Sequence, residues 1–357
     1  MKIIKTYLNG QSLVPVMAIT CLMLLTGCAR PAQILRVASD EKIEAIAISP
    51  DGAKLAATAW GSRGIELWDV SSGRLIMNLN ERPWNMWEDT NTFSFVYQIA
   101  DLEFSPDGKW LSGTDGSGFV IWDIFSGTER FRRRRGPGGL DLSPGWSADS
   151  KWLALPSTPL PEQESFAMTN GIALIETAIG KRSAFFPVEI GYARSARISP
   201  NGKLLATAGH DCTVRVYDLE ARTNIFEDFT QGTLFALAFS PDGKQLVAGP
   251  SVGGVFLLYD VVTENGRTTV VKKGTSRLET GEEFHMLEFT PDGRFALSTS
   301  PANTRIWDTK NWTMVALVPG RTGRLWPDGT KIALWREERS NVIEVWNLPD
   351  LMKKYHR

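Results

Sequence analysis

A four-residue turn sequence recurs along the whole chain. It first appears as Ser49-Pro50-Asp51-Gly52 and returns almost letter for letter at 105–108, 199–202, 240–243 and 290–293. Residues 327–329 keep its Pro-Asp-Gly half, and Ser147-Ala148-Asp149-Ser150 has lost both proline and glycine. Proline presets φ at about −65°, Asp or Asn bonds the local backbone, and glycine supplies the left-handed corner. A side chain at that corner costs roughly 1–2 kcal/mol, so the repeated glycine predicts a repeated tight turn.

The spacing of these turns converts a turn motif into an architecture. Six steps separate Pro50 from Pro327, a mean repeat of about 46 residues, near the repeat length of a propeller blade. Alternating apolar segments flank each turn, as at 43–48 and 54–59 around the first copy. Alternation with period two is typical of β-strands. Each repeat therefore begins with two strands joined by a hairpin.

A third segment in each repeat ends on an apolar–aromatic–acid step. The copies are Leu67-Trp68-Asp69, Ile121-Trp122-Asp123, Val216-Tyr217-Asp218, Leu258-Tyr259-Asp260 and Ile306-Trp307-Asp308, with Val345-Trp346-Asn347 and Leu174-Ile175-Glu176 as weaker forms. A short turn and a fourth segment follow, as at 74–79. Seven repeats of four antiparallel strands predict an all-β fold, a seven-bladed β-propeller.

The sequence from 33 to 347 resembles the WD-repeat (WD40-like) propeller family. The Trp-Asp pairs at 68–69, 122–123 and 307–308, with their upstream turns, carry the resemblance. The chain departs from the family in lacking a Gly-His pair ahead of each first strand, since Gly209-His210 lies inside the fourth repeat. The family's buried His–Ser/Thr–Asp–Trp hydrogen-bond set is therefore expected to be absent.

The two ends of the propeller predict how the ring closes. The seventh repeat stops after its third strand at Val345-Trp346-Asn347, and an unmatched strand-like segment, 33–37, precedes the first repeat. If 33–37 supplies the outer strand of the last blade, two open sheet edges are paired at once. We expect a propeller over 33–347, closed by the N-terminal strand, and a C-terminal tail over 348–357.

The N-terminal residues resemble the signal peptide of a bacterial lipoprotein. Lys2 and Lys5 precede an apolar run, 13–25, that is shorter than the ~20 residues that span a bilayer. Leu25-Thr26-Gly27-Cys28 resembles a lipobox, in which cleavage precedes the cysteine and its sulfur is acylated, with palmitate for example. The alternative is an ordinary signal peptide with an incidental cysteine. The lipobox implies a signal peptide over 1–27, a lipid anchor at Cys28 and a tether over 28–32. The mature protein would then sit on the cell membrane or outer membrane, facing the periplasm or the exterior.

Charge and cysteine content limit the classes of function. The chain has 39 Lys and Arg against 40 Asp and Glu, and loss of Lys2 and Lys5 with 1–27 leaves 37 against 40, net −3. Such a balance argues against general nucleic-acid binding. Cleavage removes Cys21 and acylation commits Cys28, so Cys212 remains as the single thiol and no intramolecular disulfide is expected. We expect a monomer without cofactor or metal.

The order of strands assigns each connection to a face of the propeller. We call the face with the Ser-Pro-Asp-Gly turns the bottom face and the opposite one the top face. The chain enters the closing strand about five residues after Cys28, at most roughly 18 Å away, so the bottom face is expected towards the membrane. Long insertions at 80–97, 156–170 and 273–283 are predicted on the top rim. We also expect Lys353 and Lys354 in the tail either to be solvated or to touch anionic head groups.

Two groups of residues are candidates for binding a partner. Aromatic residues are favoured in interface hot spots, and four of them lie in the first insertion: Trp84, Trp87, Phe93 and Tyr97. They either anchor a protein partner or plug the channel and pad neighbouring blades. The basic run at 130–135 supplies Arg132, Arg133, Arg134 and Arg135. It belongs to an outer strand, where basic side chains protect an exposed edge, or it binds an acidic protein, phosphate or glycan.

Catalytic motifs are missing from the sequence. The histidines are His210, His285 and His356, and there is no His-Glu-x-x-His, Gly-x-Ser-x-Gly or phosphate-binding glycine loop. The sequence favours a lipid-anchored, non-catalytic protein–protein interaction scaffold of the cell envelope that binds a protein partner through the top face. The alternative is a propeller enzyme, of hydrolase or lactonase type, or a small-ligand receptor at the channel mouth.

Overall fold

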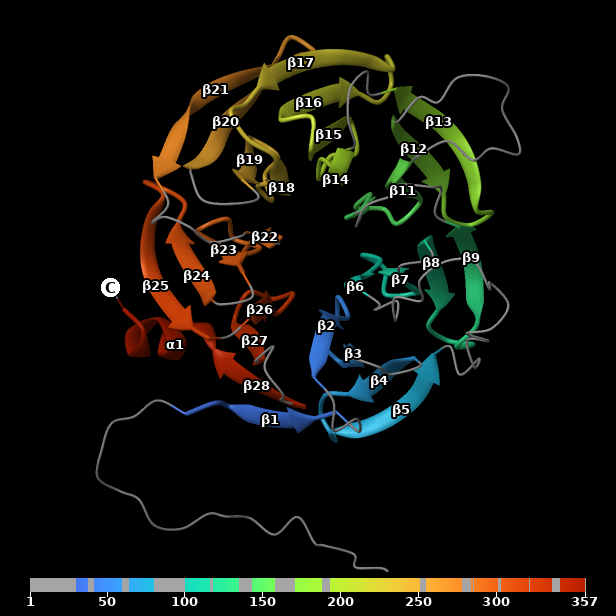
Figure 1. The fold of residues 1–357 in the computed structure, drawn as a ribbon, viewed down its shortest axis with the longest axis vertical. Helices are drawn as coiled ribbons and strands as arrows, with labels where there is room; N and C mark the ends of the chain where they lie inside the picture. Colours follow the sequence, from blue (N-terminus) through green and yellow to red (C-terminus); the bar gives the residue numbers. More distant parts are fainter. Residues whose placement is uncertain are drawn as a thin grey trace, which may run out of the picture.

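Seven four-stranded antiparallel sheets stand around a central axis in the computed structural model (Figure 1). The structure describes residues 30–37, 42–59, 64–79, 100–115, 118–134, 143–157, 171–187, 193–250, 255–277, 284, 286–300, 303–320, 322–335 and 341–356. Each sheet is one blade, and its first strand lies nearest the axis (Figure 1). The predicted seven-bladed all-β propeller is confirmed.

The first four blades follow the chain in order from the axis outwards. Blade 1 consists of β2 (Ile43–Ile48), β3 (Lys54–Ala59), β4 (Ile65–Asp69) and β5 (Arg74–Leu79). Blade 2 consists of β6 (Ala100–Phe104), β7 (Trp110–Asp115), β8 (Gly118–Asp123) and β9 (Glu129–Arg134). Blade 3 consists of β10 (Gly145–Trp146), β11 (Trp152–Ser157), β12 (Gly171–Glu176) and β13 (Lys181–Pro187). Blade 4 consists of β14 (Ala193–Ile198), β15 (Leu204–Gly209), β16 (Thr213–Asp218) and β17 (Thr223–Phe229).

The last three blades include the one that closes the ring. Blade 5 consists of β18 (Leu234–Phe239), β19 (Gln245–Pro250), β20 (Val255–Glu264) and β21 (Arg267–Arg277). Blade 6 consists of β22 (Met286–Phe289), β23 (Phe295–Thr299), β24 (Asn303–Asp308) and β25 (Thr313–Pro319). Blade 7 consists of β26 (Thr322–Leu325), β27 (Lys331–Trp335), β28 (Val342–Asn347) and, on its outer edge, β1 (Gln33–Arg36).

Ring closure by the N-terminal strand is confirmed. β1 pairs antiparallel with β28, from Gln33 opposite Val345 to Arg36 opposite Val342. The side-chain amide of Gln33 also donates to the carbonyl of Val70 in blade 1 (2.6 Å). Because the N–H of Val70 donates to Ala53, beside the first Ser-Pro-Asp-Gly turn (2.9 Å), β1 begins at the bottom face.

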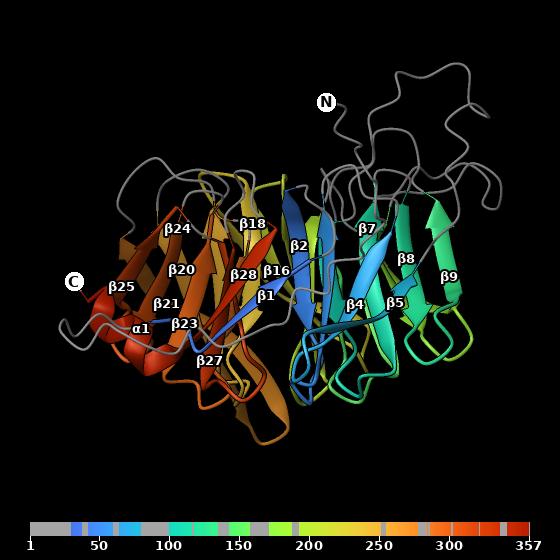
Figure 2. The ribbon, with the colours of Figure 1, turned by 90° about the horizontal axis from the view of Figure 1, so that it is seen from below.

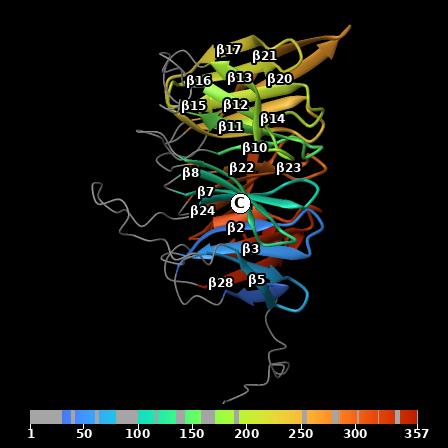
Figure 3. The ribbon, with the colours of Figure 1, turned by 90° about the vertical axis from the view of Figure 1, so that its right-hand side faces the viewer.

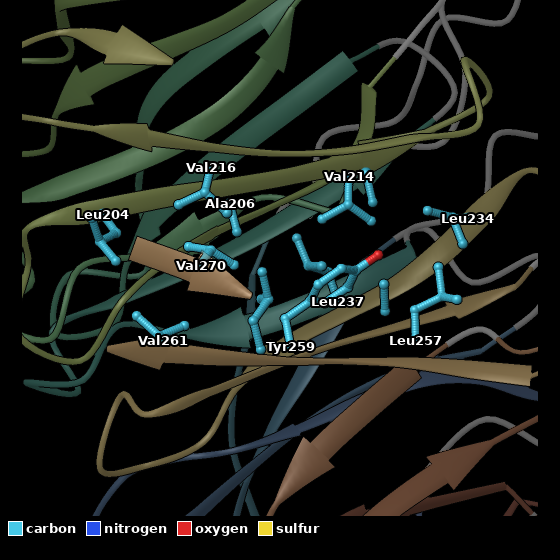
Figure 4. Packing of buried hydrophobic residues seen from close by; sticks show 13 residues of the cluster. Leu204, Ala206, Val214, Val216, Leu234, Leu237, Leu257, Tyr259, Val261 and Val270 are labelled. Carbon is cyan, nitrogen blue, oxygen red and sulfur yellow. The ribbon is translucent and has the colours of Figure 1, made fainter. Parts of the chain in front are cut away.

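Apolar side chains fill the wedges between neighbouring blades. The wedge between blades 4 and 5 packs Leu204, Val214 and Val216 against Leu237, Tyr259 and further residues of blade 5 (Figure 4). The wedge between blades 7 and 1 joins Val345 and Trp335 to Ile43 and Ile46, and includes Leu35 of β1. Successive residues of a strand point into the wedges on opposite sides of their blade, so inner strands such as β12 and β15 are buried on both faces.

One hydrogen-bond pattern builds the recurring turns on the bottom face (Figure 2). In blade 5 the Ser240 hydroxyl donates to Asp242 (2.6 Å), and Asp242 accepts the N–H of Lys244 (3.0 Å). The same Ser240 oxygen accepts the N–H of Gln245 (2.9 Å), and Gly243 takes φ of +71°. Serine, acid and glycine thus have separate roles, which explains why the sequence repeats all three.

The degenerate copy in blade 3 keeps the complete turn. Ser147 donates to Asp149 (2.6 Å) and accepts the N–H of Trp152 (2.9 Å). Ser150 occupies the glycine position with φ of +60°. Its hydroxyl accepts the N–H of Asp107 in blade 2 (2.9 Å), a bond that helps to offset the unfavourable φ.

A second turn on the bottom face joins the third and fourth strands of every blade except blade 7, and we call it the outer turn. The acid of the Trp-Asp step caps it: in blade 1, Asp69 accepts the N–H and hydroxyl of Ser72 and the hydroxyl of Ser71, each at 2.7 Å. These bonds, led by that of the Ser71 hydroxyl, lower the pKa of Asp69 to about 2. The first residue of the outer turn also bonds back to the hairpin turn. In blade 2 the N–H of Ile124 donates to the carbonyl of Lys109 (3.0 Å).

The aromatic residue of the Trp-Asp step uses different acceptors in different blades. In blade 1 the indole N–H of Trp68 donates to Glu66 two residues earlier (3.1 Å), and blade 7 repeats this arrangement. In blade 6 the indole of Trp307 donates to Ser298 on the second strand (2.8 Å). Glutamate and serine thus hold the indole in these blades, in place of the histidine-containing set of the family.

Two segments differ from the sequence expectation. The end of the chain, expected only as a tail, forms α1 (Leu348–Lys354), which buries Leu348 and Leu351 between blades 6 and 7 (Figure 1). Lys354 lies over the ring of Trp346, 4.4 Å from its centroid. The insertion expected over 273–283 was placed too early, because residues 273–277 belong to β21. No helix among the described residues is long and apolar enough to cross a membrane.

Two turn glycines with equal φ predict a difference in stability. Gly202 and Gly329 have φ of +72° and +71°, but a methyl group on Gly329 would lie 2.7 Å from Pro291 Cδ, while one on Gly202 meets nothing within 4 Å. We expect Gly202→Ala to cost about 1 kcal/mol, the left-handed penalty alone. Gly329→Ala should cost about 1–3 kcal/mol more, because the crowded turn must shift. Urea unfolding of both variants measures this, and equal losses would contradict the contact.

The turn carboxylates predict loss of stability in acid. Hydrogen bonds from the turn hydroxyl lead the lowering of the pKa of Asp51, Asp149, Asp242 and Asp292. Carboxylates with a folded pKa below the unfolded value of about 3.9 stabilise the protein above that pH, and this stability is lost as pH falls through the lower folded pKa. Urea unfolding at successive pH values should therefore show stability declining below about pH 4.

Blade 4 supplies the control, since Asn201 makes the bonds of the acid, accepting from Ser199 (2.7 Å) and Lys203 (3.1 Å). Asp242→Asn should preserve stability near pH 7 within about 0.5 kcal/mol and weaken its acid dependence. Asn201→Asp should strengthen that dependence. An unchanged acid profile in both variants would show that these turns do not control it.

Candidate interaction site

Most residues predicted to bind a partner lie outside the described residues. This holds for Trp84, Trp87, Phe93, Tyr97 and Arg135, and the predicted lipidation site Cys28 lies outside them as well. Arg132, Arg133 and Arg134 belong to β9, the outer strand of blade 2. In the β8–β9 register Arg133 stands opposite Phe119, and Arg134 opposite Gly118. The placement of this basic run on an outer strand is as predicted, and its binding role stays a prediction.

The described arginines of β9 have partners close by. Arg132 contacts both carboxylate oxygens of Glu129, with Nε at 3.0 Å from each and Nη2 at 2.8 Å from one. Arg130 donates to the carbonyl of Ala178 in the outer turn of blade 3 (2.8 Å). Phe131 packs on the same turn, 2.8 Å from where a methyl group of Gly180 would lie. These residues therefore link blades 2 and 3.

Arg324 of β26 bonds to the first strands of neighbouring blades. Its guanidinium forms an ion pair with Glu288 of blade 6 and donates to the carbonyls of Ile46 in blade 1 (3.3 Å) and Leu102 in blade 2 (2.6 Å). Glu288 also accepts the N–H of Leu325 (3.1 Å). One side chain thus joins four consecutive blades, 6, 7, 1 and 2, at their inner strands. This residue was not singled out by sequence reasoning, although an arginine within a short first strand is the available signal.

A second arginine lies at the matching position of blade 4. Arg197 donates to the carbonyl of Pro144 (2.6 Å) and to the hydroxyl of Ser143 (2.8 Å), both leading into blade 3. Gly145 makes room for this contact, because a methyl group there would lie 2.4 Å from the carbonyl oxygen of Ala196. Small residues, Gly145 on β10 and Ala238 on β18, stand at the matching positions on either side of Arg197 and leave room for its side chain.

The top face is described best at blades 4 and 5. The guanidinium of Arg194, near the top end of β14, lies 3.6 Å from the ring centroid of Phe235 on β18. His210, in the loop between β15 and β16, approaches the same ring edge-on at 5.5 Å. Burial and the charge of Arg194 lower the pKa of His210. Phe229, at the top end of β17, is 77% exposed. We call Arg194, His210, Phe229 and Phe235 the blade 4–5 rim.

A buried ion pair supports this rim from below. Arg215 of β16 pairs with Asp211, and the two side chains are only 9% and 3% exposed. Arg215 also reaches Glu227 of β17 at 3.3 Å. Burial works against the charged form of Arg215, but the hydrogen bond and charge of Asp211 raise its pKa overall. The guanidinium therefore stays protonated and fixes the loop that carries His210.

The described residues contain no group of three or more His, Cys, Asp and Glu side chains placed to hold a metal ion. Cys212 follows His210 and Asp211 in the same loop, at φ of +55°, and has a free thiol. Its Sγ lies 3.7 Å from the carbonyl of His210. The rim therefore offers aromatic rings and a cation, which suit recognition of another molecule by contact.

Comparison with known proteins identifies WD repeats in this chain. The profile of the family "WD domain, G-beta repeat" matches residues 89–123 and 190–218. The "Small ribosomal subunit protein RACK1" of Schizosaccharomyces pombe is 30% identical over 120 residues, which cover 33% of this chain and 38% of that protein. "Protein groucho" of Drosophila melanogaster is 27% identical over 258 residues, covering 71% of this chain and 32% of that protein.

A third relative and a solved structure complete the comparison. "Periodic tryptophan protein 2" of Arabidopsis thaliana is 24% identical over 270 residues, 72% of this chain and 27% of that protein. The chain thus spans well under half the length of these relatives. A chain from a "Crystal Structure of Mitotic Checkpoint Complex" superposes with a TM-score of 0.66 at 17% identity, covering 97% of this chain and 99% of that one. At this identity the likeness shows the shared fold.

Removal of the channel arginine should destabilise the ring. Arg324→Ala leaves Glu288 and two inner-strand carbonyls without a charged partner, so we expect unfolding free energy to fall by about 1–3 kcal/mol. Lys151→Ala is the control, because Lys151 pairs with Asp149 at 3.6 Å and is 73% exposed, and it should change stability by less than about 0.5 kcal/mol. Urea unfolding compares the two, and equal stabilities would refute the role of Arg324.

Proposed function

We propose that this protein is a lipid-anchored, non-catalytic interaction scaffold of the bacterial cell envelope that binds a protein partner through its top face. WD-repeat propellers generally mediate protein–protein interactions, and the repeats, the fold and the relatives support that class. The bacterial origin, the anchor and the choice of face rest on the sequence and on the geometry argued next.

The channel arginine is the observation that carries the proposal. An enzyme or receptor acting inside the channel needs open space at the axis, where groups from several blades converge. Here the guanidinium of Arg324 lies along the inner strands of blades 6, 7, 1 and 2 and is committed to Glu288 and to the carbonyls of Ile46 and Leu102. This arrangement favours a filled channel with recognition on the outer surfaces.

The direction of β1 supports the division between two faces. Gln33 bonds to Val70 at the bottom of blade 1, and only five residues separate Gln33 from Cys28 in the sequence. An acyl chain on Cys28 would hold the bottom face within roughly 18 Å of the membrane surface. The top face, with the blade 4–5 rim and the insertion containing Trp84 and Trp87, would then point away and stay accessible to a partner.

Capture of partners from detergent-solubilised envelopes tests this function. We expect mass spectrometry to identify a partner with the wild-type protein, and both Phe229→Ala and the double variant Trp84→Ala, Trp87→Ala to weaken its binding at least about tenfold, as loss of hot-spot aromatics does. Phe229 is 77% exposed, so its replacement should leave the melting temperature unchanged.

Two controls complete the capture experiment. Ile34→Ala removes a side chain that is 55% exposed on the outer strand β1, away from the top face, and should leave binding intact. Mass spectrometry should find Cys28 acylated and at the start of the mature chain, and Cys28→Ser should abolish both the acylation and the cleavage, whereas Cys212→Ser should change neither. Retained partner binding by all top-face variants would refute the choice of face. A wild-type protein without acyl groups on Cys28 would refute the anchor, and collapse of folding in the tryptophan variant would assign Trp84 and Trp87 to packing.

A further inference from the structure

The bottom face carries exposed apolar side chains on its outer turns. Phe125, in the outer turn of blade 2, is 96% exposed, and Ile179, in that of blade 3, is 55% exposed. The position of Phe125 is occupied by Ser71 in blade 1, Glu220 in blade 4 and Lys310 in blade 6. A phenylalanine with almost its whole side chain in water contributes nothing to the core, so its presence here needs an explanation other than packing.

The turns that carry these side chains are firmly held. Asp123 accepts the N–H groups of Phe125 and Ser126, both at 2.9 Å. The outer turn of blade 3 is fixed by the bond from Arg130 to Ala178 and by the packing of Phe131 on Gly180. Because blade 2 holds the turn of blade 3 in this way, Phe125 and Ile179 project from the fixed outer turns of two neighbouring blades.

A second apolar element projects from the same face at blade 5. In other blades the third strand ends at the residue that corresponds to Asp260. In blade 5, β20 and β21 continue past it to a turn at Asn265 and Gly266. The hairpin reaches beyond the other turns (Figures 2 and 3). Asp260 stands opposite Val271, and Val262 opposite Thr269, so Val262 and Val271 share one face of the hairpin. They are 39% and 55% exposed.

The start of β1 provides a third point on this face. β1, the outer turns of blades 2 and 3, and the β20–β21 hairpin lie at well-separated places around the ring (Figure 1). Three such points define a plane across the bottom face. We propose that this face rests on the lipid bilayer, with Phe125 and Ile179 on one side and the Val262 and Val271 face of the β20–β21 hairpin on the other entering the interfacial region.

The proposal rests on the proposed lipid anchor, which selects the bilayer as the occupant. The tether of five residues is too short to let the bottom face turn away from the membrane to which Cys28 would be attached. Exposed apolar side chains held on rigid turns at that distance match the burial that interfacial binding uses. The short tether limits the distance between the bottom face and the membrane, and the apolar contacts fix the orientation of the propeller on it.

Charge on this face predicts which lipids matter. Hairpin turns place an acid beside a base, as Asp107 with Lys109 at 3.2 Å and Asp149 with Lys151 at 3.6 Å. The outer turns likewise carry both signs, since the capping residues Asp218 and Asp308 lie close to Arg222 and Lys310. Attraction to anionic head groups therefore does not drive the contact, and seating should depend little on anionic lipid or salt.

Site-specific fluorescence of the full-length, acylated protein tests the proposal. Phe125→Cys in a Cys212→Ser background is labelled with nitrobenzoxadiazole and reconstituted into phosphatidylcholine vesicles. We expect the emission to shift to shorter wavelength than in detergent-free buffer without lipid, and to be quenched by nitroxide-labelled lipid. The result should be the same when phosphatidylglycerol replaces part of the phosphatidylcholine. Because Phe125 is exposed, the substitution should leave the melting temperature unchanged.

The matched control places the same label on the top face. Gly232 is exposed in the connection between blades 4 and 5, and a side chain there meets nothing within 4 Å. The Gly232→Cys probe should show neither shift nor quenching. Equal signals from the two positions, in protein whose acylation at Cys28 is established by mass spectrometry, would overturn the seating while leaving the anchor intact. Absence of acylation would refute the proposed anchor, and with it the seating.

Discussion

The first and last blades of a propeller must be joined, because otherwise the apolar surfaces that face each other between them, and two sheet edges, would be exposed to water. Here the join is made by hydrogen bonds between β1 and β28, which build one blade from both ends of the chain. Leu35 and Val37 from the N-terminal side then pack with Ile343 and Val345 and with blade 1. α1 takes the place that outer turns have in other blades and packs along β25 and β28. The ends of the chain are thus part of the core, and every face of the molecule depends on their positions.

The ring repeats a few interactions and tolerates changes in the residues that make them. Asn201 replaces the turn acid and still accepts both bonds. Ser150 replaces the turn glycine and gains a bond to blade 2. Glu66 and Ser298 accept from the indoles of different blades. Each replacement keeps a hydrogen bond at its position while the side chain changes. Blades with weak sequence similarity therefore form the same four-stranded sheet.

Much of the fold could be predicted because its rules are local. A proline, an acid and a glycine in order specify a tight turn, period-two alternation specifies a strand, and the spacing of repeats specifies a blade. The helix over Leu348–Lys354 was missed because its stability comes from burying Leu348 and Leu351 against other blades. The extension of β21 through Arg277 was missed because cross-strand pairing with β20 sustains it. The site was harder still to predict from the sequence, because the fold brings Arg324 together with Glu288, Ile46 and Leu102 from distant parts of the chain.

Sequence by itself determined the number of blades and the face of each turn, and it predicts Cys28 as the site of a lipid anchor. These depend on contacts between residues close in the chain, or on a motif read before folding. Tertiary structure alone decided that one guanidinium joins four consecutive blades, that Arg194, His210 and Phe235 meet at one rim, and that Phe125 stands in water. The physical reason is that the position of a side chain across a ring depends on the closure of the whole ring, and no short stretch of sequence contains that information.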